Sequence, residues 1–219
     1  MDLKQAMTER HSVRSYLDRP IESEVSNALS EFIEECNKKS GLHLQLVLNE
    51  PKAFDGFMAH YGKFSGVRNY VALIGKKGED EKIGYYGEKI ALFAQSIGLN
   101  TCWVALTYKK IKTAFTVEKG EKVHCVLALG YGATHGVQHK SKSANEVSTG
   151  YDDAPSWFRN GVNAALLAPT AMNQQKFTLC YEDGKVRAEA GAGFYTQMDL
   201  GIVKCHFELG AEKDDIEWI

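Results

Sequence analysis

Hydrophobic positions recur along the chain with two periods, which predicts a protein built from both helices and strands. After Pro20, apolar residues at helical spacing share one face while Glu and Lys occupy the other. This pattern predicts a helix, and Gly41 ends it as a left-handed cap would. Leucine then stands at every second position over 42–48, which predicts a strand with one well-buried face.

The remaining apolar patterns extend this mixture over the whole chain. Runs that are apolar on both faces at 70–74 and 122–130 predict central strands. The apolar stripe of 79–97 is so wide that we expect a buried helix, ended by Gly98. Further helices are predicted at 2–9, 52–61, 108–115, 156–167 and 195–210, and further strands at 177–181 and 185–189. Residues 99–105 are expected to form a short loop or a strand.

Three details add to this outline. We expect the helix at 52–61 to turn its aromatic residues and Met58 inward. Asp183-Gly184, between two strand patterns, is a strong signal for a type I′ hairpin. The tail 216–219 is short and apolar enough to dock on the rest of the protein. The helix-then-strand order of 22–48 recurs at 156–181, as if two half-domains shared a plan, although such units are common enough to recur by chance.

Composition indicates an ordinary globular protein with one large domain or two small ones. Of 219 residues, 44% are hydrophobic and 25% are charged, and the net charge is −2. No global field would attract nucleic acid or an anionic membrane, so any anion site must be local. The longest apolar runs are too short to span a bilayer, and residues 1–5 lack the apolar core of a signal peptide. A cytoplasmic location is expected.

The five cysteines are odd in number and widely spaced. Their mostly apolar surroundings fit small buried side chains in a reducing compartment. A zinc site needs close pairs of Cys or His, and none is present, so we expect no metal.

The densest group of candidate functional residues is Arg10-His11-Ser12-Val13-Arg14-Ser15-Tyr16. Arginine offers a planar fork of donors that fits phosphate oxygens, and a serine hydroxyl with backbone N–H groups can complete the site. The alternative is a solvated basic turn. A second basic cluster, Lys140-Ser141-Lys142, lies in the linker-like stretch 132–143, where the alternative is again a solvated loop.

Several motifs together resemble the nitroreductase family of flavin enzymes. Residues 10–14 resemble its Arg-x-Ser-x-Arg, and 98–103 resemble its Gly-Leu-Gly-Thr-Cys-Trp. Residues 129–131 are similar to the start of Leu-Gly-Tyr-Pro, and 168–175 to Ala-Pro-Ser-Ala-x-Asn-x-Gln. Residues 199–207 resemble the helix motif Asp-x-Gly-Ile-x-x-x-His-Phe.

The order of these motifs departs from the family pattern, in which the Pro-Ser-Ala-x-Asn segment soon follows the arginine motif. Here it lies in the second half of the chain, which lacks an arginine motif of its own. The resemblance therefore implies two fused half-domains that form a pseudo-dimer, with halves at 1–145 and 146–219. The implied fold is α+β, a mixed and mostly antiparallel sheet flanked by helices. Further homo-oligomers stay open.

The resemblance also implies a set of FMN-binding residues, and no side chain with a catalytic role. Arg10 and Ser12, with Lys140 and Lys142, would hold the phosphate and ribityl oxygens, and Arg14 the N1–C2=O edge of the flavin. Backbone groups of Ala105 and Leu106 would face flavin N5. His11 would touch the flavin or cap its turn. The segment that packs on the flavin would be formed by Pro169, Thr170, Ala171, Asn173 and Gln175. Its alternative is a simple helix C-terminal turn.

The function that the resemblance implies is an FMN-dependent oxidoreductase. NAD(P)H and a small nitroaromatic or quinone-like acceptor would occupy the same slot in turn, in a ping-pong sequence. The acceptor and the choice between NADH and NADPH stay open, because they depend on lining loops such as 54–66 and 107–115. One alternative is an FMN carrier without significant turnover, and another is a structural protein that has lost the cofactor.

Overall fold

The computed structural model describes residues 1–219, which form two compact units. The first unit contains Met1, Glu9–Glu79 and Ile90–Val137. The second unit contains Asp2–Thr8, Asp80–Lys89 and Gln138–Ile219. The units therefore interleave along the sequence, whereas the sequence prediction divides the chain once, between 145 and 146.

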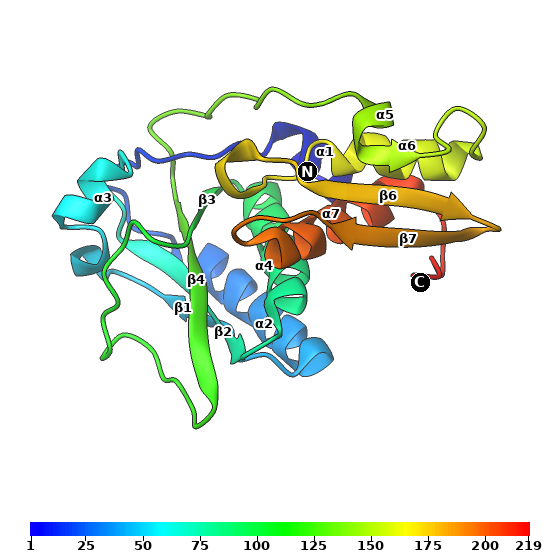
Figure 1. Ribbon diagram of the computed structural model, residues 1–219. Coiled ribbons are helices and arrows are strands. Elements are labelled where there is room, and N and C mark those ends of the chain that lie inside the picture. The colour runs from blue at the N-terminus through cyan, green and yellow to red at the C-terminus, as the bar shows by residue number, and fades with distance from the viewer. The chain divides into compact units, whose positions relative to one another are not determined.

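The first unit is built on a four-stranded antiparallel sheet with the order β1-β2-β4-β3. The predicted central strands, β2 and β4, are indeed in the middle, and nearly all their residues are buried (Figure 1). The strands of this sheet are β1 (Gln45–Val47), β2 (Asn69–Lys76), β3 (Asn100–Val104) and β4 (Glu121–Gly130).

Different parts of the chain cover the two faces of this sheet, which is why the middle residues of its central strands, 70–74 and 125–129, are apolar on both faces. Helix α2 (Ser23–Ser40) and the last turns of α4 (Asp80–Ser96) pack together through Phe32 and Phe93, whose rings stack 4.2 Å apart. Another cluster joins Tyr16 and Phe54 to Tyr70 of β2 and Val126 of β4. As predicted, Gly41 ends α2 in the left-handed conformation.

The edge strand β1 is shorter than the leucine alternation predicts. Leu42 and Leu44 are buried, but the pattern then shifts, because Val47 is buried while Leu48 is 45% exposed. Leu44 lies before the strand, where its N–H and C=O both bond to the Asn37 side chain. Its burial is therefore set by the connection from α2 and not by the strand period.

The prediction that 52–61 forms one helix with its aromatic residues and Met58 facing inward is wrong. The segment forms a 3₁₀ turn, η1 (Pro51–Ala53), and a short helix, α3 (Phe57–Tyr61). Gly56, with an extended backbone, interrupts them and changes which side chains face inward. Phe54 is buried, but Phe57 and Tyr61 are 82% and 75% exposed, and Met58 is also exposed.

The helix predicted at 108–115 is also wrong. This stretch runs as turns without a helix. It is held by contacts to distant residues: the Lys109 N–H donates to the Ala53 carbonyl oxygen, and the Thr116 N–H donates to the Gln45 side chain. Tertiary hydrogen bonds thus replace the local ones that a helix would need.

The second unit combines helices with a three-stranded sheet of order β5-β6-β7. Strand β5 (Ser148–Thr149) is parallel to β6 (Phe177–Glu182), and β6 pairs antiparallel with β7 (Lys185–Ala190). Asp183 and Gly184 both have positive φ, as the predicted type I′ turn requires. The sequence missed β5 and the helix before it, α5 (Ala144–Val147), since neither is long enough to show a period.

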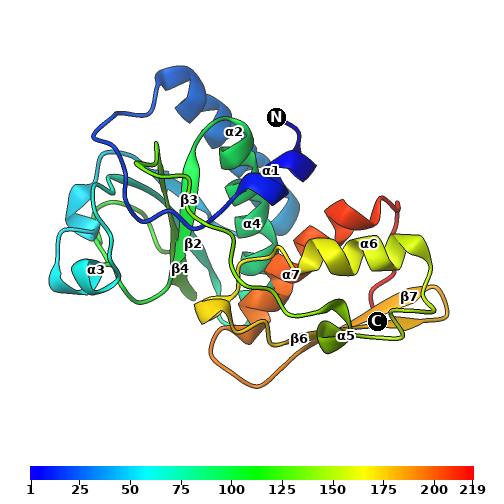
Figure 2. The same cartoon turned by 90° about the horizontal axis from the view of Figure 1, so that it is seen from above.

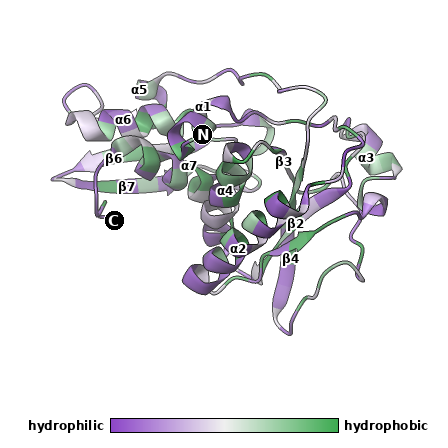
Figure 3. Ribbon diagram, turned by 180° about the vertical axis from the view of Figure 1, so that it is seen from behind, coloured by the Kyte–Doolittle hydropathy of each residue, from purple (hydrophilic) through white to green (hydrophobic).

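The helices of the second unit are α1 (Leu3–Glu9), α5, α6 (Ser156–Ala165), α7 (Thr196–Ala211) and residues 80–89 of α4. Helices α6 and α7 run side by side (Figure 2), and hydrophobic residues concentrate on α7 (Figure 3). The predicted docking of the tail is confirmed, because Trp218 pairs with Val186 of β7 and donates a hydrogen bond from Nε1 to Glu208. None of the helices combines the length and hydropathy that crossing a bilayer would take. All five cysteines are buried free thiols.

Helices α4 and α7 cross with their backbones in close contact. A Cβ atom at Gly84 would overlap the Met198 carbonyl oxygen, and one at Gly201 would overlap the Glu81 carbonyl oxygen. Two glycines are therefore required where these helices meet.

A buried contact between a histidine and a glutamate lies between the same two helices. His206 Nε2 of α7 lies 2.9 Å from Glu88 Oε1 of α4, and neither side chain is exposed. His206 Nδ1 lies 3.2 Å from the Ala164 carbonyl oxygen of α6. The pair thus joins three helices.

The helix crossing predicts the effect of adding one methyl group. Gly201→Ala should lower the free energy of unfolding by about 1–3 kcal/mol or more, because a backbone contact cannot yield as a side chain would. Gly56→Ala is the control, since a Cβ there meets no atom within 4 Å, and it should change stability by less than about 0.5 kcal/mol. Urea unfolding of both variants measures the difference; equal stabilities would contradict the close crossing.

Candidate functional site

The basic segment near the N-terminus is extended, and backbone hydrogen bonds hold it in the first unit. The Val13 N–H donates to the Thr101 carbonyl oxygen at 3.0 Å, and the Tyr16 N–H to the Ser65 carbonyl oxygen at 3.0 Å. On the other side, the Ala133 N–H donates to the Ser15 carbonyl oxygen at 2.8 Å. The segment is therefore not a loose solvated turn, and its side chains leave it at defined positions.

The two arginines of this segment have different surroundings. Arg10 is buried, whereas Arg14 is exposed. The Arg14 guanidinium lies 6.0 Å from the centre of the Phe64 ring and pairs with no carboxylate. Arg14 thus presents free donors to a ligand from a fixed backbone.

Two other ionisable side chains lie next to these arginines. Burial raises the pKa of the Cys102 thiol. The positive charge of Arg14, a hydrogen bond with Ser12 and, last, the positive charge of Arg10 each lower this pKa in part. Burial also raises the pKa of Tyr16 well above its usual value, and both arginines oppose this shift. Cys102 and Tyr16 therefore stay neutral near pH 7 and leave the positive charge of Arg14 uncompensated.

Glycines let the loop at 132–136, which follows β4, approach the basic segment. A Cβ on Gly136, whose φ is +72°, would lie 2.8 Å from the His11 Cβ. One on Gly132 would lie 2.6 Å from Asn100 Oδ1, which accepts the Gly132 N–H. His11 therefore packs against this loop.

The candidate turn of the second unit has an unusual backbone. After α6, the chain forms the 3₁₀ turn η2 (Ala171–Asn173), and Met172, Asn173 and Gln175 have φ of 51°, 54° and 45°. Residues other than glycine rarely adopt this left-handed conformation, and several close together are costly. The turn persists because its surroundings stabilise it.

Gln175 ties this turn to the basic stretch at 140–142. Its buried Nε2 donates to the Lys140 carbonyl oxygen and to Asn173 Oδ1, both at 2.9 Å. Its Oε1 accepts the Lys142 N–H at 2.8 Å, and Lys142 Nζ donates to the Gln175 carbonyl oxygen at 2.8 Å. The Lys142 ammonium is thus engaged within the protein, whereas the Lys140 ammonium is exposed and makes no such contact.

A buried carboxylate holds the same turn from the side of α7. Asp199 Oδ1 accepts the Ala171 N–H at 2.9 Å, and Oδ2 accepts Gln174 Nε2 at 2.7 Å. Burial raises the pKa of the Asp199 carboxyl, and the hydrogen bonds from Gln174 and Ala171 oppose this shift. The sequence prediction gave no role to Asp199 or Gln174. The signal that could have pointed to Asp199 is the presence of an acidic residue in a mostly apolar helix.

The residues expected at the flavin N5 follow β3, an edge strand of the first sheet. Ala105 and Leu106 come directly after β3, and Leu106 is 69% exposed. Their backbone groups are therefore near the surface of the first unit.

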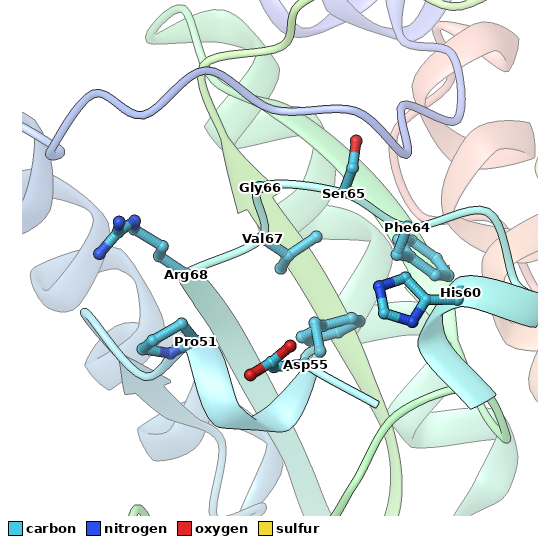
Figure 4. Close-up of a pocket in the computed structure, with 9 residues that line it drawn as sticks. Pro51, Asp55, His60, Phe64, Ser65, Gly66, Val67 and Arg68 are labelled. Carbon is cyan, nitrogen blue, oxygen red and sulfur yellow. The ribbon is translucent and has the colours of Figure 1, made fainter. Parts of the chain in front are cut away.

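A pocket of about 280 Å³ opens in the loop 51–68 of the first unit. Phe54 and Phe64 give it apolar walls, and in Figure 4 the Asp55 carboxylate lies between Arg68 on one side and His60 on the other. The Arg68 Nε is already 2.9 Å from the Asp18 carboxylate. The pocket therefore offers an apolar surface and no free arginine.

The predicted site residues form two groups, one in each unit. The first unit holds Arg10, His11, Ser12, Arg14, Ala105 and Leu106. The second unit holds Lys140, Lys142, Pro169, Thr170, Ala171, Asn173 and Gln175.

A family model described as "Putative TM nitroreductase" matches residues 2–211, nearly the whole chain. The protein belongs to this nitroreductase family. The predicted α+β nitroreductase-like fold is confirmed.

Solved structures share the fold of this nitroreductase-family chain. A Thermotoga maritima protein described as a "putative nitroreductase" is 23% identical, with a TM-score of 0.70, over 96% of this chain and 83% of that one. A Desulfovibrio desulfuricans structure, described as a "putative nitroreductase in complex with FMN", is 14% identical with a TM-score of 0.50, over 67% of this chain and 95% of that one.

A third structure, from Parabacteroides distasonis, is described as a "putative NADH dehydrogenase/NAD(P)H nitroreductase". It is 18% identical with a TM-score of 0.53, over 68% of this chain and 99% of that one. A comparison with curated proteins found no match.

The contacts of Gln175 predict how its loss would change the second unit. Gln175→Ala should lower the free energy of unfolding by about 1–3 kcal/mol, because the Lys140 carbonyl and the Lys142 amide lose a buried partner. The Lys142 amide should exchange hydrogen faster in native-state exchange. The control is Gln138→Ala, an exposed glutamine of the same unit, which should change neither quantity. Unchanged exchange at Lys142 in the Gln175 variant would contradict this arrangement.

Proposed function

We propose that this nitroreductase-family protein is an FMN-dependent oxidoreductase that uses NAD(P)H to reduce small, electron-poor acceptors such as nitroaromatics or quinones. The observation that carries the proposal is Arg14, which presents a guanidinium without a carboxylate partner from a backbone fixed on both sides. The FMN named for the D. desulfuricans relative and the NAD(P)H named for the P. distasonis relative support the same chemistry.

The residues of the basic segment suit the polar parts of FMN. The Arg14 guanidinium can donate to the N1–C2=O edge of the flavin, where a cation stabilises the negative charge of the reduced ring. Arg10 and Ser12 are proposed for the phosphate and ribityl oxygens. The loop that contains Gly132 and Gly136 packs against His11 and Val13 of this segment.

A role in FMN binding is also proposed for the turn of the second unit. Pro169, Thr170 and Ala171 would supply backbone and apolar surface, and the exposed Lys140 ammonium would meet the phosphate. Gln175 and Lys142 are mainly engaged with each other, so their proposed role is to hold this turn. We further propose that the chain is a pseudo-dimer of two fused halves, since the arginine motif and the 168–175 motif lie in different halves of the chain.

The chemistry itself would come from the cofactor, because a bound flavin would supply hydride transfer between NAD(P)H and the acceptor. The protein would orient the ring and stabilise its negative charge, so no side chain need act as acid or base. Backbone groups of Ala105 and Leu106 are proposed to face N5. The apolar walls of the 51–68 pocket and the exposed Phe57 and Tyr61 offer surface for an electron-poor ring.

The visible spectrum of the purified protein tests the proposal. We expect a yellow protein with an absorption band near 450 nm that NADH or NADPH bleaches and a quinone restores. A protein that holds FMN but resists both nicotinamides would be an FMN carrier, and one that stays colourless after FMN is added would refute both functions.

The role of Arg14 can be tested by FMN titration. Arg14→Ala should weaken FMN binding about 10- to 100-fold, because charge-assisted hydrogen bonds contribute about 1.5–3 kcal/mol each. Arg187→Ala serves as the control, since that guanidinium is already bonded to Glu182 and Glu189. Quenching of flavin fluorescence measures the affinities; equal loss in both variants would exclude a specific contact from Arg14.

A further inference from the structure

The turn at 170–175 should not hold its shape unaided. Three of its residues, Met172, Asn173 and Gln175, have left-handed backbones without being glycine. Each such residue costs free energy, which the surrounding contacts must offset. Met172 is fully exposed and cannot supply those contacts. Hydrogen bonds within the turn, such as the one from Gln175 Nε2 to Asn173 Oδ1, are therefore supplemented by contacts from outside it.

The side chain placed to supply them from α7 is Asp199. It is 3% exposed, and each carboxylate oxygen accepts one hydrogen bond from the turn, from the Ala171 N–H and from Gln174 Nε2. Gln174 Nε2 also donates to the Phe194 carbonyl oxygen at 2.9 Å. One carboxylate thus fixes both ends of the 3₁₀ turn to the start of α7.

From this geometry we infer that Asp199 is a positioning residue, which holds the 170–175 turn in the shape that contacts the cofactor. The inference rests on the proposed function, because it assumes that the turn binds FMN. Asp199 itself makes no contact with the cofactor in this account, since its two oxygens are bonded to the turn.

The positioning role of Asp199 can be tested apart from its effect on folding stability, because burying its charge costs stability. Because burial raises the pKa of the Asp199 carboxyl, the folded state binds its proton more tightly than the unfolded chain does. Folding stability therefore falls as the pH rises from the ordinary aspartate pKa through the raised one. The cost of burying the charge opposes the gain from its hydrogen bonds, so a neutral residue of the same shape is tolerated.

Asp199→Asn tests the inference with little change of shape. Asn keeps one oxygen for the Ala171 N–H but turns a donor toward the Gln174 amide. In metal centres, loss of an outer partner that orients a ligand costs about 10- to 100-fold in affinity, and we expect a similar loss in FMN affinity. The visible circular dichroism of bound FMN should also change. The melting temperature of the FMN-free protein should stay within about 3 °C of the unmodified protein or rise.

A second change should restore the contact. In Asp199→Asn with Gln174→Glu, the amide and the carboxylate exchange places, so the bond between the two side chains forms again, although position 174 can no longer donate to the Phe194 carbonyl oxygen. FMN affinity should recover part of its loss. Asp183→Asn, an exposed change in the β6–β7 hairpin, should leave affinity and dichroism unchanged.

Hydrogen exchange at the Ala171 amide of the FMN-free protein completes the test. Exchange should be faster in Asp199→Asn and slow again in the double variant. Unchanged FMN affinity and unchanged exchange in Asp199→Asn would overturn the inference. So would a loss of affinity that only follows a fall in melting temperature and is not recovered in the double variant. If the unmodified protein binds no FMN, the proposed function fails, and exchange at Ala171 still decides whether Asp199 holds the turn.

Discussion

Backbone hydrogen bonds fix the position from which Arg14 leaves the first unit. A short basic segment near a chain terminus would ordinarily be mobile, and its arginines would sample many directions. Here Val13 and Tyr16 are buried, and main-chain bonds reach Thr101 and Ser65, which are distant in sequence. The cost of ordering the backbone that carries Arg14 is therefore met on folding, before any ligand binds.

Close backbone packing makes this arrangement dependent on glycine. A Cβ on Gly66, whose φ is +70°, would overlap the Tyr16 carbonyl oxygen. Gly132 and Gly136 restrict the loop on the other side in the same way. The segment can lie between its neighbours only because three positions around it carry no side chain. These three glycines and the basic segment thus belong to one structural requirement.

The second unit depends on the hydrogen bonding of buried polar groups. Asp199, Gln175 and the His206–Glu88 pair are almost wholly buried, and each would destabilise the fold if its partners were lost. Because the partners of Asp199 and Gln175 are backbone groups of the turn and the 140–142 stretch, satisfying these side chains also shapes the surface. The hydrogen bonds that satisfy these buried side chains therefore also set the geometry of the proposed site.

The sequence alone determined the mixture of helices and strands, the central strands, the caps, the type I′ hairpin and the family, because these follow from local periodicity and from motifs. It did not determine the inward face of 52–61, the turns at 108–115 or the role of Asp199. Those depend on Gly56 resetting a helix face and on hydrogen bonds to partners far along the chain, such as Ala53 and Ala171. Local propensity is carried by neighbouring residues, whereas burial and long-range bonds exist only once the chain has folded, and so only the tertiary structure decided them.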